Sequence, residues 1–237
     1  MSWFDSFLSV IYPKRCPCCG ELNVTGEPCE RCSENLEELR LKEPCCLKCG
    51  DEKMNCKCSG FNPLYNGVIS VFKNKGAAQS GIYGLKFNSR FYAAEYFGLE
   101  MAKTFSKRCA AVKPDVVCVV PMTAKERNSQ PCDQVHLLAK CIVKELKLPY
   151  DPKLIKKIRE TKRQHTLSHR ERAANVKGAF AVRNKLYGKI VLLIDDIKTS
   201  GYTLNECAKQ LRLNGAAQVW CLTALYTSKG SCNNDGK

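Results

Sequence analysis

Ten of the chain's 17 cysteines lie before residue 60, and eight of these ten form four closely spaced pairs. Three pairs follow the C-x2-C pattern, and the fourth is the tighter C-x-C. The pairs are Cys16/Cys19, Cys29/Cys32, Cys46/Cys49 and Cys56/Cys58. A segment of about 60 residues buries only about 60% of the surface of its unfolded chain, so it is marginally stable without a further constraint. Cysteines that recur in pairs at this spacing predict that constraint.

The spacing of the pairs indicates metal binding. A C-x2-C turn points two thiolates to one side, and two such turns complete a tetrahedral site with Zn–S bonds of about 2.3 Å. Four pairs therefore predict two zinc sites, and such sites contribute on the order of 10–16 kcal/mol each to folding. Ligand sets made of cysteine alone favour structural zinc over catalytic zinc.

Two points about the cysteines stay open. The C-x-C spacing of Cys56 and Cys58 is not usual for a zinc knuckle, so we expect either one or two bound zinc ions. Cys18 and Cys45 are additional thiols beside the expected ligands. Redox-active or simply buried cysteines are the alternative to metal ligands.

Hydropathy and the N-terminal residues indicate where the chain resides. Residues 1–12 have no basic region, and Asp5 interrupts their apolar character, so they do not resemble a signal peptide. No stretch approaches the roughly 18 uninterrupted apolar residues of a transmembrane segment. We therefore expect a cytoplasmic protein, in which clustered cysteines bind metal or carry redox chemistry more often than they form disulfides.

Charge and periodicity divide the chain at residue 60. Residues 1–60 carry eight basic and ten acidic side chains, whereas residues 61–237 carry 30 basic and 13 acidic ones. The net charge of +15 thus comes from the second part and favours an anionic partner there. We expect a small zinc-binding module with an N-terminal helix in residues 1–60 and a second domain in residues 61–237. The helix is predicted from Trp3, Phe4, Phe7, Leu8 and Ile11.

The second part alternates between strand-like and helix-like segments. Apolar runs of strand length lie at 68–72, 116–120, 190–194 and 219–225. Helical periodicity covers 77–87, 91–107, 133–146 and 203–214. This alternation predicts an α/β fold with a parallel sheet flanked by helices on both faces. Ligands bind to such sheets at the carboxyl ends of the strands.

The most specific motif follows the apolar run at 190–194. Two adjacent carboxylates, Asp195 and Asp196, precede a hydroxyl-rich turn and a helix start; the turn comprises Lys198, Thr199, Ser200, Gly201, Tyr202 and Thr203. Carboxylates at a strand end can accept hydrogen bonds from the hydroxyls of a ribose. The turn offers backbone N–H groups and a helix N-terminus to a phosphate, and Gly201 permits a positive φ or close approach. The alternative is an ordinary strand–helix connection capped by Thr203.

These residues resemble the signature of the type I phosphoribosyltransferases, a hydrophobic strand, an acidic pair and the loop T-[TS]-G-x-T. A second stretch narrows the resemblance: residues 159–180 match R-x-T-x-x-Q-x-x-L, then R-x-x-N, then G-x-F, starting at Arg159, Arg172 and Gly178. With the cysteine pairs and with Pro121 after its strand, the sequence is similar to the ComF family over nearly its whole length.

The resemblance implies a zinc-ribbon module ahead of a type I phosphoribosyltransferase-like domain. Asp195 and Asp196 would hold the ribose hydroxyls, and residues 198–203 the 5-phosphate, of phosphoribosyl pyrophosphate (PRPP) or a related sugar phosphate. Mg²⁺ would neutralise the departing pyrophosphate. The turn 121–127 corresponds to the pyrophosphate loop, with Pro121, Lys125 and Arg127, and the basic stretch 159–172 to a mobile flap, with Arg159, Lys162 and Arg163.

The family context implies uptake of single-stranded DNA during natural transformation. Two main functions stay open, besides that of a scaffold whose zinc module docks a helicase-like competence partner. The chain is either a phosphoribosyltransferase, in the glycosyltransferase class, or a non-catalytic accessory protein that binds single-stranded DNA with the same fold. In the second case the bases would stack on Tyr83, Phe87, Phe91, Tyr92 and Phe97, although aromatic residues among helix formers lie more often in a core.

One departure from the family pattern bears on turnover. The family usually has R-G-F-N-Q before its second helix, where this chain has Gln130-Pro131-Cys132-Asp133-Gln134. An arginine and a flexible glycine are thereby lost beside the pyrophosphate loop. We therefore expect phosphate binding to be better retained than turnover.

Overall fold

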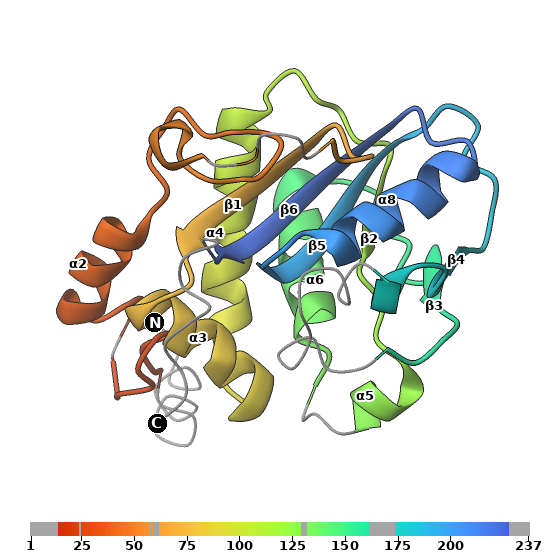
Figure 1. Cartoon of the computed structure of the whole chain (residues 1–237). Coiled ribbons are helices and arrows are strands. Elements are labelled where there is room, and N and C mark those ends of the chain that lie inside the picture. The colour runs from red at the N-terminus through yellow and green to blue at the C-terminus, as the bar shows by residue number, and fades with distance from the viewer. Residues whose placement is uncertain are drawn as a thin grey trace.

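A four-stranded parallel sheet forms the centre of the protein. The computed structural model describes residues 14–23, 25–56, 58, 62–128, 132–161 and 174–227. The strands are β1 (Gly67–Lys73), β2 (Val116–Val119), β5 (Ile190–Lys198) and β6 (Gln218–Tyr226), in the order β1-β6-β5-β2. Each neighbouring pair is parallel, so the carboxyl ends of all four strands lie at one edge (Figure 1). The expected parallel sheet is confirmed.

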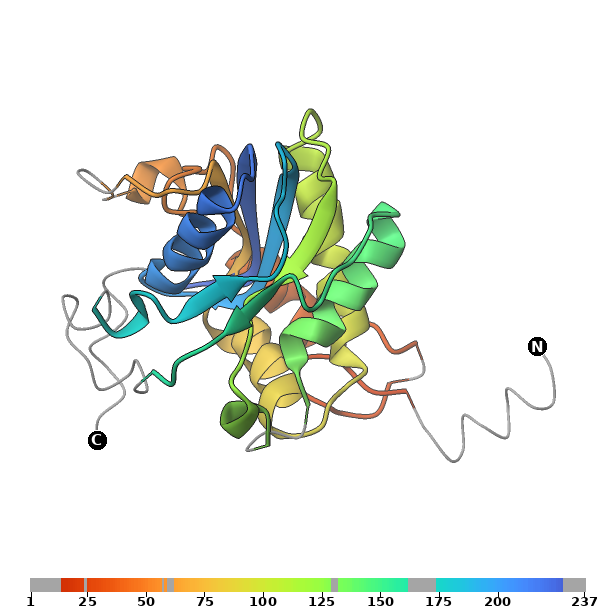
Figure 2. The same cartoon turned by 90° about the vertical axis from the view of Figure 1, so that its right-hand side faces the viewer.

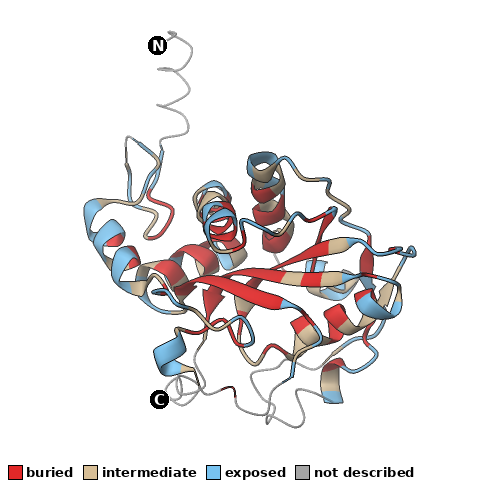
Figure 3. Cartoon of the chain, turned by 90° about the horizontal axis from the view of Figure 1, so that it is seen from above, coloured by how far each residue is buried: buried red, intermediate tan, exposed pale blue. Residues whose placement is uncertain are grey.

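Helices cover both faces of this sheet. One face packs against α3 (Gly76–Phe87), α4 (Ala93–Arg108) and α6 (Gln134–Leu146), and the other against α8 (Tyr202–Leu213). Successive residues of β5 serve opposite faces, since Leu192 and Leu193 belong to different buried clusters. The strands and the inner helix faces are buried, and the outer helix faces are exposed (Figure 3). The predicted α/β class with helices on both faces is confirmed.

The predicted strands and helices match the structure within a few residues, with one informative difference. The strand expected at 190–194 continues to Lys198, because β6 extends to Tyr226 and keeps pairing with it. The acidic pair therefore lies inside β5 rather than after it. The helix expected at 91–107 begins at Ala93, which leaves Phe91 and Tyr92 exposed before it.

Three short elements were not predicted. An antiparallel pair, β3 (Ile155–Lys157) and β4 (Phe180–Val182), lies at the front of Figure 2, which faces the β2 edge of the sheet. The five-residue helix α5 (Ala124–Asn128) follows β2. Elements this short carry no periodicity from which they could be recognised.

The cysteine-rich segment lies against β1, the edge strand of the sheet (Figure 1). It contains α2 (Glu30–Leu39) and a 3-10 turn, η1 (Lys53–Asn55). The Leu41 amide donates to Val71 O, and the Val68 amide donates to Leu47 O. These bonds occupy polar groups of an edge that would otherwise be open to another chain.

Two further sequence predictions concern the ends of this segment. The helix predicted from Trp3 to Ile11 lies outside the described residues. The division of the chain at residue 60 stays a prediction. Among the described helices, none is long and apolar enough to cross a membrane.

Candidate functional site

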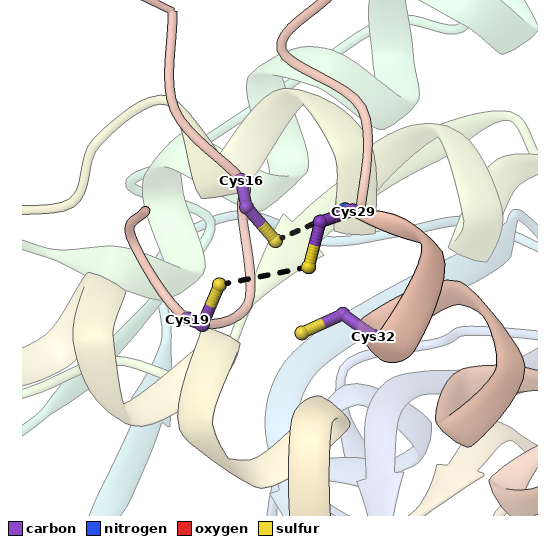
Figure 4. A group of neighbouring side chains, drawn as sticks. All are labelled: Cys16, Cys19, Cys29 and Cys32. Atoms are coloured by element: carbon purple, nitrogen blue, oxygen red, sulfur yellow. Dashed lines mark hydrogen bonds between the residues drawn. The ribbon is translucent and has the colours of Figure 1, made fainter. Parts of the chain in front are cut away.

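The eight paired cysteines form two groups of four. In the first group Cys16 and Cys19 meet Cys29 and Cys32, and in the second Cys46 and Cys49 meet Cys56 and Cys58. Within each group all sulfur atoms lie within 4.8 Å of one another. Figure 4 shows the first group, in which the four side chains point toward a common centre. The four pairs of the sequence thus form two four-cysteine groups that could hold zinc, and the role of these residues as metal ligands stays a prediction.

The sulfur separations test whether a metal fits these groups. A tetrahedron with Zn–S bonds of about 2.3 Å has edges of about 3.8 Å. The Cys19–Cys29 separation is 3.8 Å, and Cys46–Cys58 is 3.7 Å. The separations of Cys56 from Cys49 and Cys58 are 3.5 and 3.2 Å. These separations equal the tetrahedron edge or are somewhat shorter, so both groups could hold a tetrahedral ion. They are much longer than the S–S bond of about 2.05 Å, so neither group contains a disulfide.

Backbone amides favour the thiolate form of the first cysteine in each group. Burial alone would raise the pKa of Cys16, but hydrogen bonds from nearby backbone amides outweigh it and lower that pKa to about 6. The same balance of burial and amide donors lowers the pKa of Cys46 to about 7. Burial, and then the neighbouring thiolates, raise the pKa of the additional thiol Cys18. Cys18 is therefore a buried neutral thiol next to the first group.

The acidic pair lies at the carboxyl edge of the sheet, where its two carboxylates have different surroundings. Asp196 is buried, and its Oδ2 accepts a hydrogen bond from Gln134 Nε2 at 2.9 Å. Lys86 Nζ lies 3.9 Å from the same oxygen. Asp195 is half-buried, and strand alternation directs it to the opposite face. On that face, burial and then the Asp195 carboxylate raise the pKa of Cys207 on α8.

Burial and the neighbouring Asp196 raise the pKa of Asp195 well above its ordinary value of 3.8. A carboxyl whose folded pKa is raised stabilises the fold below its unfolded pKa, and that contribution is lost as the pH rises. Asp195→Asn should therefore raise Tm at pH 7–8 by at least ~2–4 °C, which corresponds to about 1 kcal/mol. The difference from the wild type should shrink as the pH falls toward 4. Thermal melting across this pH range measures it, and a variant with an unchanged or lower Tm at pH 8 would contradict it.

The loop after β5 turns directly into α8. Gly201 is the N-cap residue of α8 and has φ of +80°, a left-handed conformation that glycine adopts without strain. A Cβ at this position would lie 3.3 Å from Lys198 Cε. Of the two uses of Gly201 that were expected, a positive φ or close approach, the structure shows the positive φ. Phosphate binding by residues 198–203 stays a prediction.

The turn after β2 begins beside the acidic pair, since the Val120 amide donates to Ile194 O. Within this turn Thr123 and Glu126 each bond the other's backbone amide with their side chains. This capping box starts α5 and was visible in the sequence as T-A-K-E, but it was missed. Lys125 and Arg127 are exposed on α5.

The turn after β2 and the start of the predicted flap come together. Lys157 on β3 donates to Glu126 Oε1 at 2.7 Å, and Lys125 lies 3.8 Å from Glu160. Arg159 is exposed and donates to the backbone oxygens of Asn175 and Lys177. Lys162 and Arg163 lie outside the described residues. The roles predicted for these cations stay predictions.

Two residues at the acidic pair were not predicted as site residues, Lys86 and Gln134. Gln134 is 2% exposed, and within the described part of the chain its Oε1 is buried without a hydrogen-bond partner. An unsatisfied buried acceptor costs about 1–3 kcal/mol, which is more typical of a binding site than of a packed core. The motif comparison kept Gln134 but gave it no role, and no local pattern relates Lys86 to a carboxylate 110 positions away in the chain.

The fold and the site together define a class of protein. A parallel α/β sheet with an acidic pair and a glycine loop at its carboxyl edge, preceded by two four-cysteine groups, is a type I phosphoribosyltransferase-like fold with a cysteine-rich module. Among solved structures the chain is similar to the glutamine phosphoribosylpyrophosphate amidotransferase from B. subtilis (TM-score 0.38, 22% identity, 62% of this chain and 28% of that longer chain). It is also similar to a hypoxanthine-guanine phosphoribosyltransferase from Bacillus anthracis (TM-score 0.40, 13% identity, 61% of this chain and 74% of that chain). Because both scores lie below 0.5, the fold class rests on the topology given above.

Sequence relatives agree with the family resemblance of the motifs. No family model matches the sequence. The DNA utilization protein YhgH of Salmonella typhi is 29% identical over 201 residues, which cover 82% of this chain and 88% of the relative. Competence protein F of Haemophilus influenzae is 27% identical over 86% of this chain and 94% of its own, and competence protein ComFC of Bacillus subtilis 25% identical over 85% and 73%. These relatives, at 25–29% identity over more than four fifths of the chain, support the ComF family that the motifs predicted.

Proposed function

We propose that the protein binds the ribose 5-phosphate part of PRPP at the carboxyl edge of its sheet. The observation that carries this proposal is the continuity of β5, the acidic pair, the Gly201 loop and α8 in one unbroken segment. Asp196 would accept hydrogen bonds from the ribose hydroxyls, and the loop amides would donate to the 5-phosphate. Bound Mg²⁺ would neutralise the charge of the pyrophosphate group.

The two four-cysteine groups are proposed to hold structural zinc. Both donor sets consist of four sulfur atoms within 4.8 Å of one another, which suits a closed, four-coordinate zinc site. Zinc would stabilise a segment that has few other means of folding. The ions would take no part in chemistry at the sheet edge.

The proposed biological context is DNA handling in the cytoplasm during competence. Support comes from relatives whose names refer to competence or to DNA utilization. An enzyme that transfers the phosphoribosyl group to an acceptor is the first candidate within this context. Displacement would break the bond between the anomeric carbon and pyrophosphate and form a bond from that carbon to the acceptor.

A second candidate function is binding of single-stranded DNA without catalysis. Its support is an exposed group of aromatic side chains, Phe87, Phe91 and Tyr92, which are 57, 48 and 39% exposed. Phe97 is fully buried and Tyr83 packs against the core, so these two are not stacking platforms. Exposed aromatics on a chain of net charge +15 are typical of surfaces that stack bases beside a bound backbone.

Salt dependence separates the two candidates. Contacts to about four DNA phosphates would weaken binding roughly 100-fold between 50 and 300 mM salt. We expect the affinity for Mg²⁺-PRPP to fall less than about 10-fold over the same range, because a ligand in a partly buried site is screened less. Equilibrium binding of both ligands at both salt concentrations measures this. Undetectable PRPP binding together with steeply salt-dependent DNA binding would favour the second candidate.

A further inference from the structure

Lys198 is a buried cation at the start of residues 198–203, the loop proposed to bind phosphate and called the phosphate loop below. Its residue is 5% exposed, and its ammonium donates to Thr199 O at 3.3 Å. The same ammonium lies 4.9 Å from the centre of the Tyr226 ring, within the range of a cation–π interaction. A buried charge needs such partners, and these two direct Lys198 toward the end of β6.

Tyr226 connects Lys198 to the second four-cysteine group. Its hydroxyl donates to Asp51 Oδ2 at 3.0 Å, and both residues are buried. Asp51 follows Cys49 by two positions, and its backbone oxygen accepts from the Cys46 amide at 2.7 Å. Asp51 is therefore part of the frame that holds the Cys46 knuckle.

A second connection joins the same knuckle to the loop. The Tyr65 hydroxyl donates at 2.7 Å to the backbone oxygen of Lys48, which lies between Cys46 and Cys49. A Cβ placed on Gly201 would lie 3.6 Å from this hydroxyl oxygen. The loop therefore contacts Tyr226 through Lys198, and at Gly201 it lies close to Tyr65, which is bonded to the same knuckle.

We propose that Lys198, Tyr226 and Asp51 are positioning residues, through which the second four-cysteine group fixes the conformation of the phosphate loop. The carbonyl of Thr199 and the amide of Ser200 belong to one planar trans peptide, so they point in opposite directions. Holding Thr199 O toward Lys198 therefore holds the Ser200 amide away from it. This role also gives a reason for a lysine within the loop, where the ammonium acts on the loop backbone. The part of the proposal that concerns ligand affinity rests on the proposed function.

Hydrogen exchange in the free protein tests the positioning without any ligand. Tyr226→Phe removes the bond to Asp51 while keeping the ring, and we expect exchange of the amides of residues 199–203 to become about 10-fold faster. Asp51→Asn should act in the same direction. Tyr150→Phe is the matched control, because it removes a hydroxyl bonded to His136 on α6 and leaves the loop contacts intact. Equal loop exchange in Tyr226→Phe and Tyr150→Phe would overturn the proposal.

A double-variant cycle tests the connection to the metal group. Cys56→Ser should speed loop exchange as Tyr226→Phe does, and the combined variant should show no further increase, because both changes interrupt one connection. Fully additive effects would overturn the connection. PRPP titration of the same variants separates this inference from the proposed function. If the loop exchanges more slowly in the wild type than in Tyr226→Phe but the wild type does not bind PRPP, only the proposed function is wrong. If the wild type binds PRPP and Tyr226→Phe changes neither PRPP affinity nor loop exchange, the inference is wrong.

Discussion

Chelation of the metal from the purified protein is expected to lower Tm by more than ~10 °C. Structural zinc contributes on the order of 10–16 kcal/mol per site, which is as large as the whole stability of an ordinary domain. The loss should spread beyond the cysteine-rich segment, because Cys16, Cys32 and Leu36 belong to the same buried cluster as residues of α3 and α4. Elemental analysis combined with thermal melting measures both the metal content and its effect.

Single substitutions assign the metal to its ligands. Cys29→Ser and Cys56→Ser should each remove one of two zinc ions and lower Tm. Cys45→Ser is the matched control, because Cys45 lies beside the second group but contributes no sulfur to it, and serine can still donate to Lys42 O as the thiol does. A protein that carries no metal after purification in non-chelating buffer, or that melts unchanged after chelation, would contradict the assignment.

The combined substitution Asp195→Asn with Asp196→Asn is expected to reduce affinity for PRPP at least ~100-fold without unfolding the protein. Hydrogen bonds to a charged group contribute about 1.5–3 kcal/mol each, and 1.4 kcal/mol corresponds to a factor of ten. Of the two single variants, Asp196→Asn should have the larger effect on affinity. Its carboxylate is held by Gln134 and Lys86, whereas Asp195 lies on the other face of β5.

Asp115→Asn is the control for this prediction. Asp115 directly precedes β2 and accepts from the Ile190 amide at the opposite end of β5. Its substitution therefore changes an acid that is bonded to β5 but lies far from the acidic pair. We expect wild-type affinity in this variant. Wild-type affinity in the combined variant as well would remove the acidic pair from the binding site.

The regular elements of the fold could be predicted because their sequences are periodic. The apolar runs at 116–120 and 219–225 became β2 and β6, and the pattern at 133–146 became α6 with Asp133 as its N-cap. The length of β5 could not be predicted, because aspartate has a low intrinsic propensity for strands and β5 contains Asp195 and Asp196. Their strand conformation comes from pairing with β6, which is a tertiary contact.

The parts of the candidate site that are continuous in the sequence could be predicted. The parts formed by contacts between distant elements could not. The cysteine groupings follow from spacing alone, and the loop with Gly201 is one continuous motif. The contacts of Asp196 with Lys86 and Gln134 join β5 to two distant helices, and no spacing encodes them. Likewise, the sequence alone suggests Lys198 as a phosphate ligand. Only the structure shows that its ammonium lies over the Tyr226 ring.

Calorimetric titration of PRPP into the zinc-loaded protein, with and without Mg²⁺, tests the central claim most directly. We expect micromolar binding that requires Mg²⁺ and is lost in the combined Asp195→Asn, Asp196→Asn variant. No binding of PRPP by the folded wild-type protein, with single-stranded DNA bound in its place in a salt-sensitive manner, would contradict it.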